Sequence, residues 1–166
     1  MASFYTIGSS IGVDLANAGT TQLFGLGTTV EGNRDSVWVY VQASTSVTAY
    51  KAVAMSTAAA MGMASAKDVV VGLQLGVAQT AFAAEEYGWI PIKGSPFNVM
   101  TTGSCTAGNP LYVASSALGT GMTSSTASGT GTLIGAEYLT VQSTNTVTVA
   151  TCVLTYPMAK TPSDGV

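Results

Sequence analysis

At 166 residues, the chain fits one domain that can bury a hydrophobic core without disulfides or metals. Charged residues make up 8% of the sequence, against about 25% in typical soluble domains, whereas hydrophobic residues make up 47%. The net charge is -3, and the five basic residues are scattered singly, so no patch could neutralise several phosphates. We therefore expect no nucleic-acid partner, and a surface that is adhesive or that neighbouring molecules cover.

Residues 1–27 are rich in glycine and show neither the period of a helix nor that of a strand, so we expect an extended N-terminal arm. Apolar side chains are spaced along this arm, including Phe4, Tyr5, Leu23 and Phe24, and leaving them in water would be unfavourable. Three placements are open: docking on the chain's own sheet, docking on another subunit, or disorder.

The same segment lacks targeting signals. It has neither a basic leader nor a continuous apolar stretch before a cleavage site, so we expect synthesis in a cytoplasm without secretion. No part of the sequence supplies about 20 consecutive apolar residues, so we expect no membrane-spanning helix and no membrane partner.

The first clear β pattern covers residues 28–43, which we expect to form a hairpin. Residues 32–36 have the composition of a turn, and an alternating strand follows them. Valines occupy one face of that strand, whereas Trp38 and Tyr40 occupy the other. Because both faces are apolar, we expect the strand to be buried on both sides.

Residues 69–78 also alternate with a period of two, which favours a strand over a helix. Gly72 and Gly76 lie on the small-residue face of this pattern. Glycine weakens a strand by propensity, so we expect a bend here or the close approach of another backbone.

Five more strands are expected from short β-prone runs that turn residues separate. They cover residues 47–55, 88–93, 110–114, 132–137 and 146–156. Only residues 56–66 have a composition that leans towards helix, and Gly62 limits that helix to a turn or two.

The sequence therefore predicts an all-β protein, either a small β-barrel or a β-sandwich, at residues 28–157. The extended arm precedes this domain, and residues 158–166 form a C-terminal tail. The Ser/Thr/Gly-rich tract at residues 115–132 cannot form a core of its own. We expect it to be a long hairpin loop at the surface, with a binding loop as the alternative.

The sequence contains no histidine, which excludes Ser/His/Asp and Cys/His relays within the chain and the usual Cys/His zinc spacings. Cys105 and Cys152 are either two packed thiols or one disulfide. We predict that the protein is not an enzyme and that it uses no metal and no cofactor.

Glu85 and Glu86 form the only adjacent pair of carboxylates. A strand would place them on opposite faces and a helical turn would set them about 100° apart, so neither gives a facing acid and base. We expect a polar corner, and the alternatives are a salt bridge to another subunit or a metal or catalytic role. Trp89, just beyond, is either a packing residue or an interface anchor.

Four segments, taken in order, carry a resemblance to a known group of proteins. They are FGLGTTVEGNRDSVWVYVQAS, LQLGVAQTAFAAEEYGWIPIKG, AGNPLYV and LIGAEY. Over roughly residues 24–156, the chain resembles the capsid decoration, or cement, proteins of tailed bacteriophages. The resemblance implies a β-rich barrel or sandwich that binds the outside of an assembled shell of major capsid protein, often as a trimer or at junctions between capsomers. It implies no enzyme and no defined set of functional residues.

We therefore expect a structural virion protein that is made in the host cytoplasm and lies on the capsid exterior. It would bind the major capsid protein and stabilise the shell by bridging subunits, either as a homo-oligomer, with a trimer favoured, or as copies between capsomers. The candidate subunit contacts are Phe4, Tyr5, Leu23, Phe24 and Trp89. The alternative is an adhesion or receptor-binding module of a phage tail, a fibre or a cell surface.

Overall fold

The computed structural model describes residues 13–56, 60–63, 73–101, 104–113, 131–141 and 148–160. The regular elements in these ranges are all β-strands, which confirms the predicted all-β class. They are β1 (Thr29–Glu31), β2 (Val37–Ala43), β3 (Ala52–Met55), β4 (Ala60–Met63), β5 (Gln74–Val77), β6 (Tyr87–Thr101), β7 (Pro110–Val113), β8 (Gly131–Tyr138) and β9 (Thr148–Lys160). Phe4, Tyr5 and most of the Ser/Thr/Gly-rich tract lie outside the described residues.

β1 and β2 form the expected hairpin, in which Val30 lies opposite Trp38. The backbone N–H of Gly32 donates a hydrogen bond of 2.8 Å to the carbonyl of Ser36 and closes the turn. The side chains of β2 alternate between two apolar clusters, with Trp38 and Tyr40 in one and the valines in the other. The strand is therefore buried on both sides, as its sequence predicted.

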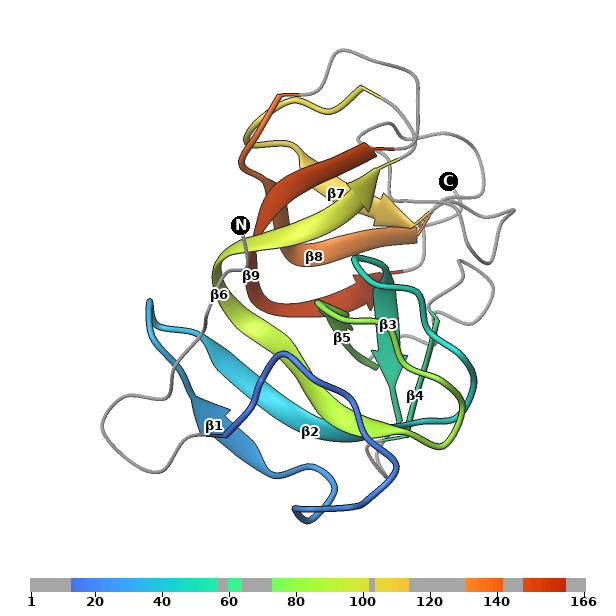
Figure 1. The fold of residues 1–166 in the computed structure, drawn as a ribbon. Coiled ribbons are helices and arrows are strands. Elements are labelled where there is room, and N and C mark those ends of the chain that lie inside the picture. Colours follow the sequence, from blue (N-terminus) through green and yellow to red (C-terminus); the bar gives the residue numbers. More distant parts are fainter. Residues whose placement is uncertain are drawn as a thin grey trace.

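β6 is the longest strand and changes its partner along its length (Figure 1). Its first half pairs antiparallel with β2 and its second half with β9, and the register shifts between Gly94 and Phe97. Gly94 has a φ of +114°, and a Cβ there would lie 2.7 Å from the Cα of Ser36, so glycine is required. The sequence predicted a strand only to Lys93, because Gly-Ser-Pro is typical of a break; a bulge accommodates it instead.

Six strands are linked in a ring, in the order β2, β6, β9, β5, β3 and β4. Two of the strand pairings in this ring involve few residues. β5 and β9 share one residue pair, Gln74 with Met158, and β2 and β4 share two pairs. The described sheet therefore curls round on itself without closing into a continuous barrel (Figure 1). β1 extends the sheet beside β2, and β8 and β7 extend it beyond β9.

Residues 60–63 form β4. This corrects the prediction that residues 56–66 contain a short helical turn. This strand pairs parallel with the end of β2 and antiparallel with β3, where Ala54 lies opposite Gly62. Helix propensity in so short a segment amounts to a few tenths of a kcal/mol per residue, which long-range pairing overrides. At the other end of the domain, β9 continues to Lys160, past the boundary expected at residue 157.

β5 and β6 pass close to each other at Gly76, as the sequence suggested. A Cβ on Gly76 would collide with the side chain of Ile90 and lie 2.8 Å from the carbonyl oxygen of Pro91. We predict that Gly76→Ala lowers the free energy of unfolding by about 1–3 kcal/mol, measured by chemical denaturation, because the core becomes overpacked.

Gly25→Ala is the matched control for this prediction. A Cβ on Gly25 would meet Thr28 Oγ1 at an ordinary 3.5 Å, so the change in stability should stay within about 0.5 kcal/mol. Equal effects of the two substitutions would contradict the close approach.

Candidate functional site

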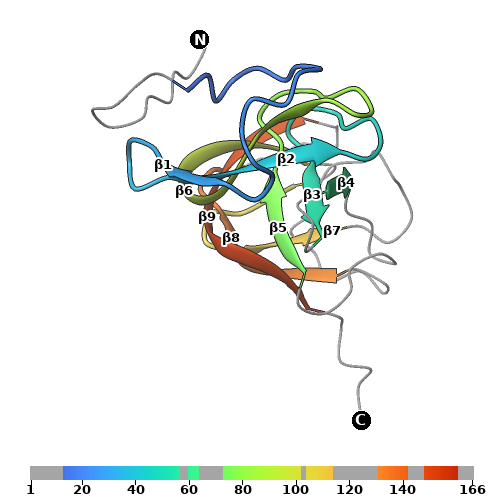
Figure 2. The same cartoon turned by 90° about the horizontal axis from the view of Figure 1, so that it is seen from below.

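Residues 13–24 are the part of the predicted N-terminal arm that docks on the chain's own sheet, and they are called the arm from here on (Figure 2). Gly19 and Tyr87 exchange two backbone hydrogen bonds, of 2.9 and 2.8 Å, which join the arm to the start of β6. Leu15 is only 3% exposed and belongs to the cluster that contains Trp38. Of the three placements that the sequence left open, the described part of the arm takes the first.

Four aromatic rings meet where the arm covers β2 and β6. Tyr40 and Trp89 are cross-strand partners, and their ring centroids lie 5.0 Å apart. Phe24 packs edge-on against both, at 5.3 Å from Tyr40 and 5.2 Å from Trp89, and Tyr87 stacks on Tyr40 at 6.3 Å. The hydroxyl of Tyr40 also accepts a hydrogen bond of 3.0 Å from the backbone N–H of Leu23. The rings therefore hold the end of the arm in place.

The candidate subunit contacts are placed differently from one another. Leu23 is 73% exposed, whereas its neighbour Phe24 is half-buried on the rings. Trp89 is only 3% exposed, because Phe24 and the arm cover it. As placed, Trp89 presents almost no surface to a second protein and packs within the chain, so its selection as a subunit contact stays a prediction.

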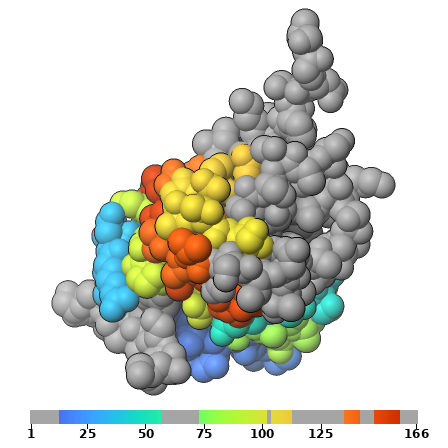
Figure 3. Space-filling view, turned by 90° about the horizontal axis from the view of Figure 1, so that it is seen from above, coloured from blue at the N-terminus to red at the C-terminus, as the bar shows by residue number. Residues whose placement is uncertain are grey.

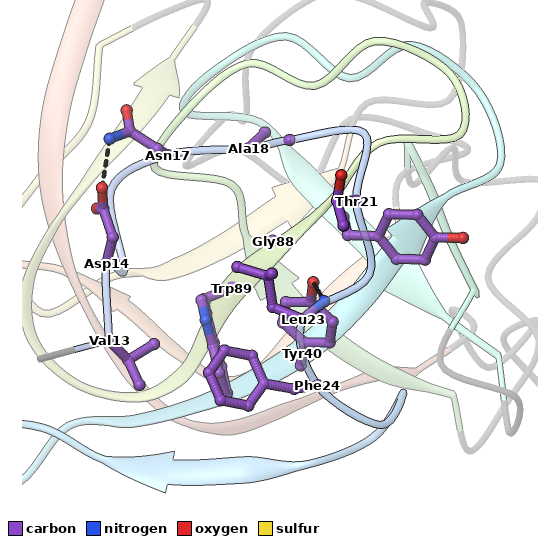
Figure 4. Close-up of a pocket in the computed structure, with 12 residues that line it drawn as sticks. Val13, Asp14, Asn17, Ala18, Thr21, Leu23, Phe24, Tyr40, Gly88 and Trp89 are labelled. Carbon is purple, nitrogen blue, oxygen red and sulfur yellow. Dashed lines mark hydrogen bonds between the residues drawn. The ribbon is translucent and has the colours of Figure 1, made fainter. Parts of the chain in front are cut away.

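The arm and the sheet form the walls of a cleft of about 180 Å³ that is partly open to solvent, here called the arm cleft. Its walls are arm residues between Val13 and Phe24, Tyr40 of β2, and the stretch of β6 from Tyr87 to Trp89. The arm curves around Gly88 and Trp89, with Val13 and Asp14 on one side and Thr21 and Leu23 on the other (Figure 4). The cleft is thus a concave site with mainly apolar and aromatic walls.

Asp14 fixes the local shape of the arm. One of its carboxylate oxygens accepts a hydrogen bond of 2.9 Å from the backbone N–H of Ala16, and the other accepts one from the side-chain amide of Asn17 (Figure 4). Both donors are neutral groups, so neither is a cationic partner for the carboxylate. Sequence analysis did not select Asp14, because an Asp in a Gly-rich segment is typical of any turn.

The adjacent carboxylates lie in the turn that leads into β6. Glu85 has a φ of +67°, and its side chain accepts a hydrogen bond of 2.9 Å from the amide of Gln42. The Glu86 side chain accepts a hydrogen bond of 2.7 Å from the backbone N–H of Ala83. Both carboxylates therefore stabilise a corner, which agrees with the polar-corner interpretation.

Cys105 and Cys152 are both buried and do not form a disulfide, so the two-thiol alternative is the observed one. Burial raises the pKa of the Cys152 thiol to about 12. Burial also raises the pKa of Tyr138, whose hydroxyl lies 3.5 Å from that of Thr101. Desolvation favours the neutral form of both groups.

Within the described ranges, no group of three or more His, Cys, Asp and Glu side chains is placed to hold a metal ion. Nor does the described part of the chain contain a helix of the length and hydropathy needed to cross a membrane. No known protein family matches the sequence, and no curated protein matches it either. The resemblance to capsid decoration proteins therefore stays a prediction.

The burial of Leu15 yields a test of how the arm is placed. We predict that Leu15→Ala lowers the free energy of unfolding by about 2–4 kcal/mol in urea denaturation, because it leaves a cavity in the core. Leu23→Ala, in the same arm but exposed, should change it by no more than about 0.5 kcal/mol. If the two variants were equally stable, the arm would not be part of the folded core.

The buried thiol predicts a loss of stability at alkaline pH. Unfolding returns Cys152 to its ordinary pKa of 9.0, so between pH 9.0 and about 12 the unfolded state loses a proton that the folded state keeps. Stability should then fall with rising pH by up to about 1.4 kcal/mol per pH unit from this group. Denaturation curves should show a shallower slope for Cys152→Ala than for the wild type, and identical slopes would contradict the assignment.

Proposed function

We propose that the protein is a structural component of a tailed-phage particle that binds the outer surface of the assembled capsid and bridges its subunits. The major capsid protein is its partner, and several copies act together, as a trimer or between capsomers. Support comes from the resemblance in four ordered segments and from the composition of the surface. A protein that binds only the assembled shell stabilises that state by mass action.

The observation that carries this proposal is a charge-poor surface on which large apolar side chains are exposed. Only 8% of the residues are charged. The exposed large apolar residues among those described are Leu23, Leu26, Leu139, Val141, Val149, Tyr156 and Met158. Single exposed apolar residues are ordinary, whereas apolar residues gathered on one surface are typical of a contact with another protein.

Three of these residues gather at one end of the β8–β9 ladder. Tyr138 pairs with Cys152, and the backbone N–H of Leu139 donates to the carbonyl of Thr151, which continues the ladder. Leu139 and Val141 follow the end of β8, and Val149 lies two residues before Thr151 in β9; we call these three residues the β8–β9 patch. β7, β8 and β9 lie together on one face of the molecule (Figure 3).

The patch is a better candidate for the capsid contact than the described arm. Leu15 and Phe24 already pack within the chain, so the arm could bridge subunits only by leaving its own sheet. The β8–β9 patch needs no such rearrangement, since Val141 is 67% exposed. Burying such residues against a partner is favourable by about 25 cal/mol per Å² of apolar surface.

We predict that the purified protein co-sediments saturably with empty particles of its cognate capsid and raises their disruption temperature. Val141→Asp should weaken this binding about tenfold, because a charge would be buried at the contact. Thr45→Asp adds the same charge at an exposed position after β2 and should bind as the wild type does. Absence of wild-type binding would overturn the proposed function, and unaltered binding of Val141→Asp would exclude the patch as its contact.

A further inference from the structure

The arm cleft is of a size that accepts one compact chemical group. Its volume of about 180 Å³ compares with about 150 Å³ for an engineered cavity that takes up one benzene molecule. Sites for drug-sized ligands are larger, about 300–1,000 Å³. A nucleotide or an oligosaccharide would exceed this volume, whereas a single ring or a branched head group would fit within it.

The lining of the cleft favours a cation. Phe24, Tyr40, Tyr87 and Trp89 all border it; Phe24 and Tyr87 are half-buried and leave ring surface accessible, whereas Tyr40 and Trp89 are each 3% exposed. The face of an aromatic ring attracts positive charge. Among the described residues that line the cleft, Asp14 is the only charged one, and none is a lysine or an arginine. No salt bridge to Asp14 occurs among the described residues, and the recorded ion pair joins Lys93 to Asp35. The cleft therefore carries negative charge that nothing in its own walls balances.

The hydrogen bonding of the cleft narrows the kind of cation. A primary ammonium group has three N–H donors to satisfy, and a bare metal ion needs several oxygen ligands. Each carboxylate oxygen of Asp14 already accepts one hydrogen bond, from Ala16 or Asn17, so this carboxylate has fewer free acceptor positions than the three N–H donors need. A quaternary ammonium group has no N–H donors and an apolar outer surface, so it suits aromatic walls with one carboxylate at the edge.

We propose that the arm cleft binds a small quaternary ammonium group, held by the rings and by the charge of Asp14. This site is separate from the β8–β9 patch and does not depend on the proposed capsid contact. Because the arm forms one wall, the ligand binds only while the arm is docked. Ligand binding therefore also stabilises the docked arm.

The test is a titration of the full-length protein with choline, followed by the NMR signal of the Trp89 indole N–H. The indole N–H of Trp38, which donates to Ser36 and lies outside the lining, is the internal reference. We expect saturable millimolar binding. The neutral compound 3,3-dimethylbutan-1-ol has the same shape without the charge and should bind about tenfold more weakly.

Two variants separate the charge from the rings. Asp14→Asn keeps an oxygen that can accept from Ala16 but removes the charge, and it should weaken choline binding about fivefold at low salt. Glu31→Gln removes an exposed carboxylate outside the lining and should have no effect. If Asp14→Asn disturbs the arm, Phe24→Leu tests the rings instead, because it keeps an apolar contact but should weaken choline binding. The proposal is overturned if choline does not saturate, if the neutral compound binds as tightly, or if the variants with an intact arm bind as the wild type does.

Discussion

Both faces of β2 have to be buried, and this requirement shapes the rest of the protein. The curl of the sheet covers the valine face, by bringing Val53 of β3 and Ile90 of β6 into the same cluster. The opposite face carries Trp38 and Tyr40, and the curl covers only part of it. Trp38 is covered by Phe97, at 5.5 Å in the second half of β6, and Tyr40 by Phe24 at the end of the arm. The arm is therefore a necessary part of the fold, although it contains no strand.

Local alternation was enough to predict β2, because a strand buried on both faces has apolar residues in every position of a period-two pattern. The same reasoning found part of β5, and short β-prone runs between turns predicted parts of β3, β7, β8 and β9. It failed where long-range pairing decides the structure. β4 is a strand because the ends of β2 and β3 supply its partners, and β6 continues beyond Lys93 because β9 pairs across a bulge at Gly94. Neither partner can be identified from the residues of the segment itself.

The arm cleft was only partly predictable for a similar reason. Phe24 and Trp89 attract attention in the sequence because they are large and apolar, but nothing local shows that they contact each other. Their contact follows from the register that sets Trp89 opposite Tyr40, which depends on the whole β2–β6 ladder. Asp14 gained its place in the lining only because the backbone of Gly19 pairs with that of Tyr87. The sequence alone was enough to select the aromatic residues, but it could not predict the cleft that they border.

The cleft and the β8–β9 patch are connected to different halves of β6. The cleft uses the half that pairs with β2, whereas the patch lies on the strands that continue from the half paired with β9. Between the two halves, Gly94 packs against Ser36 too closely for any side chain. Cores this tightly packed have discrete arrangements and do not deform gradually. A ligand in the cleft would therefore change the affinity of the patch only by altering the bulge at Gly94, and without such a change the two surfaces act independently.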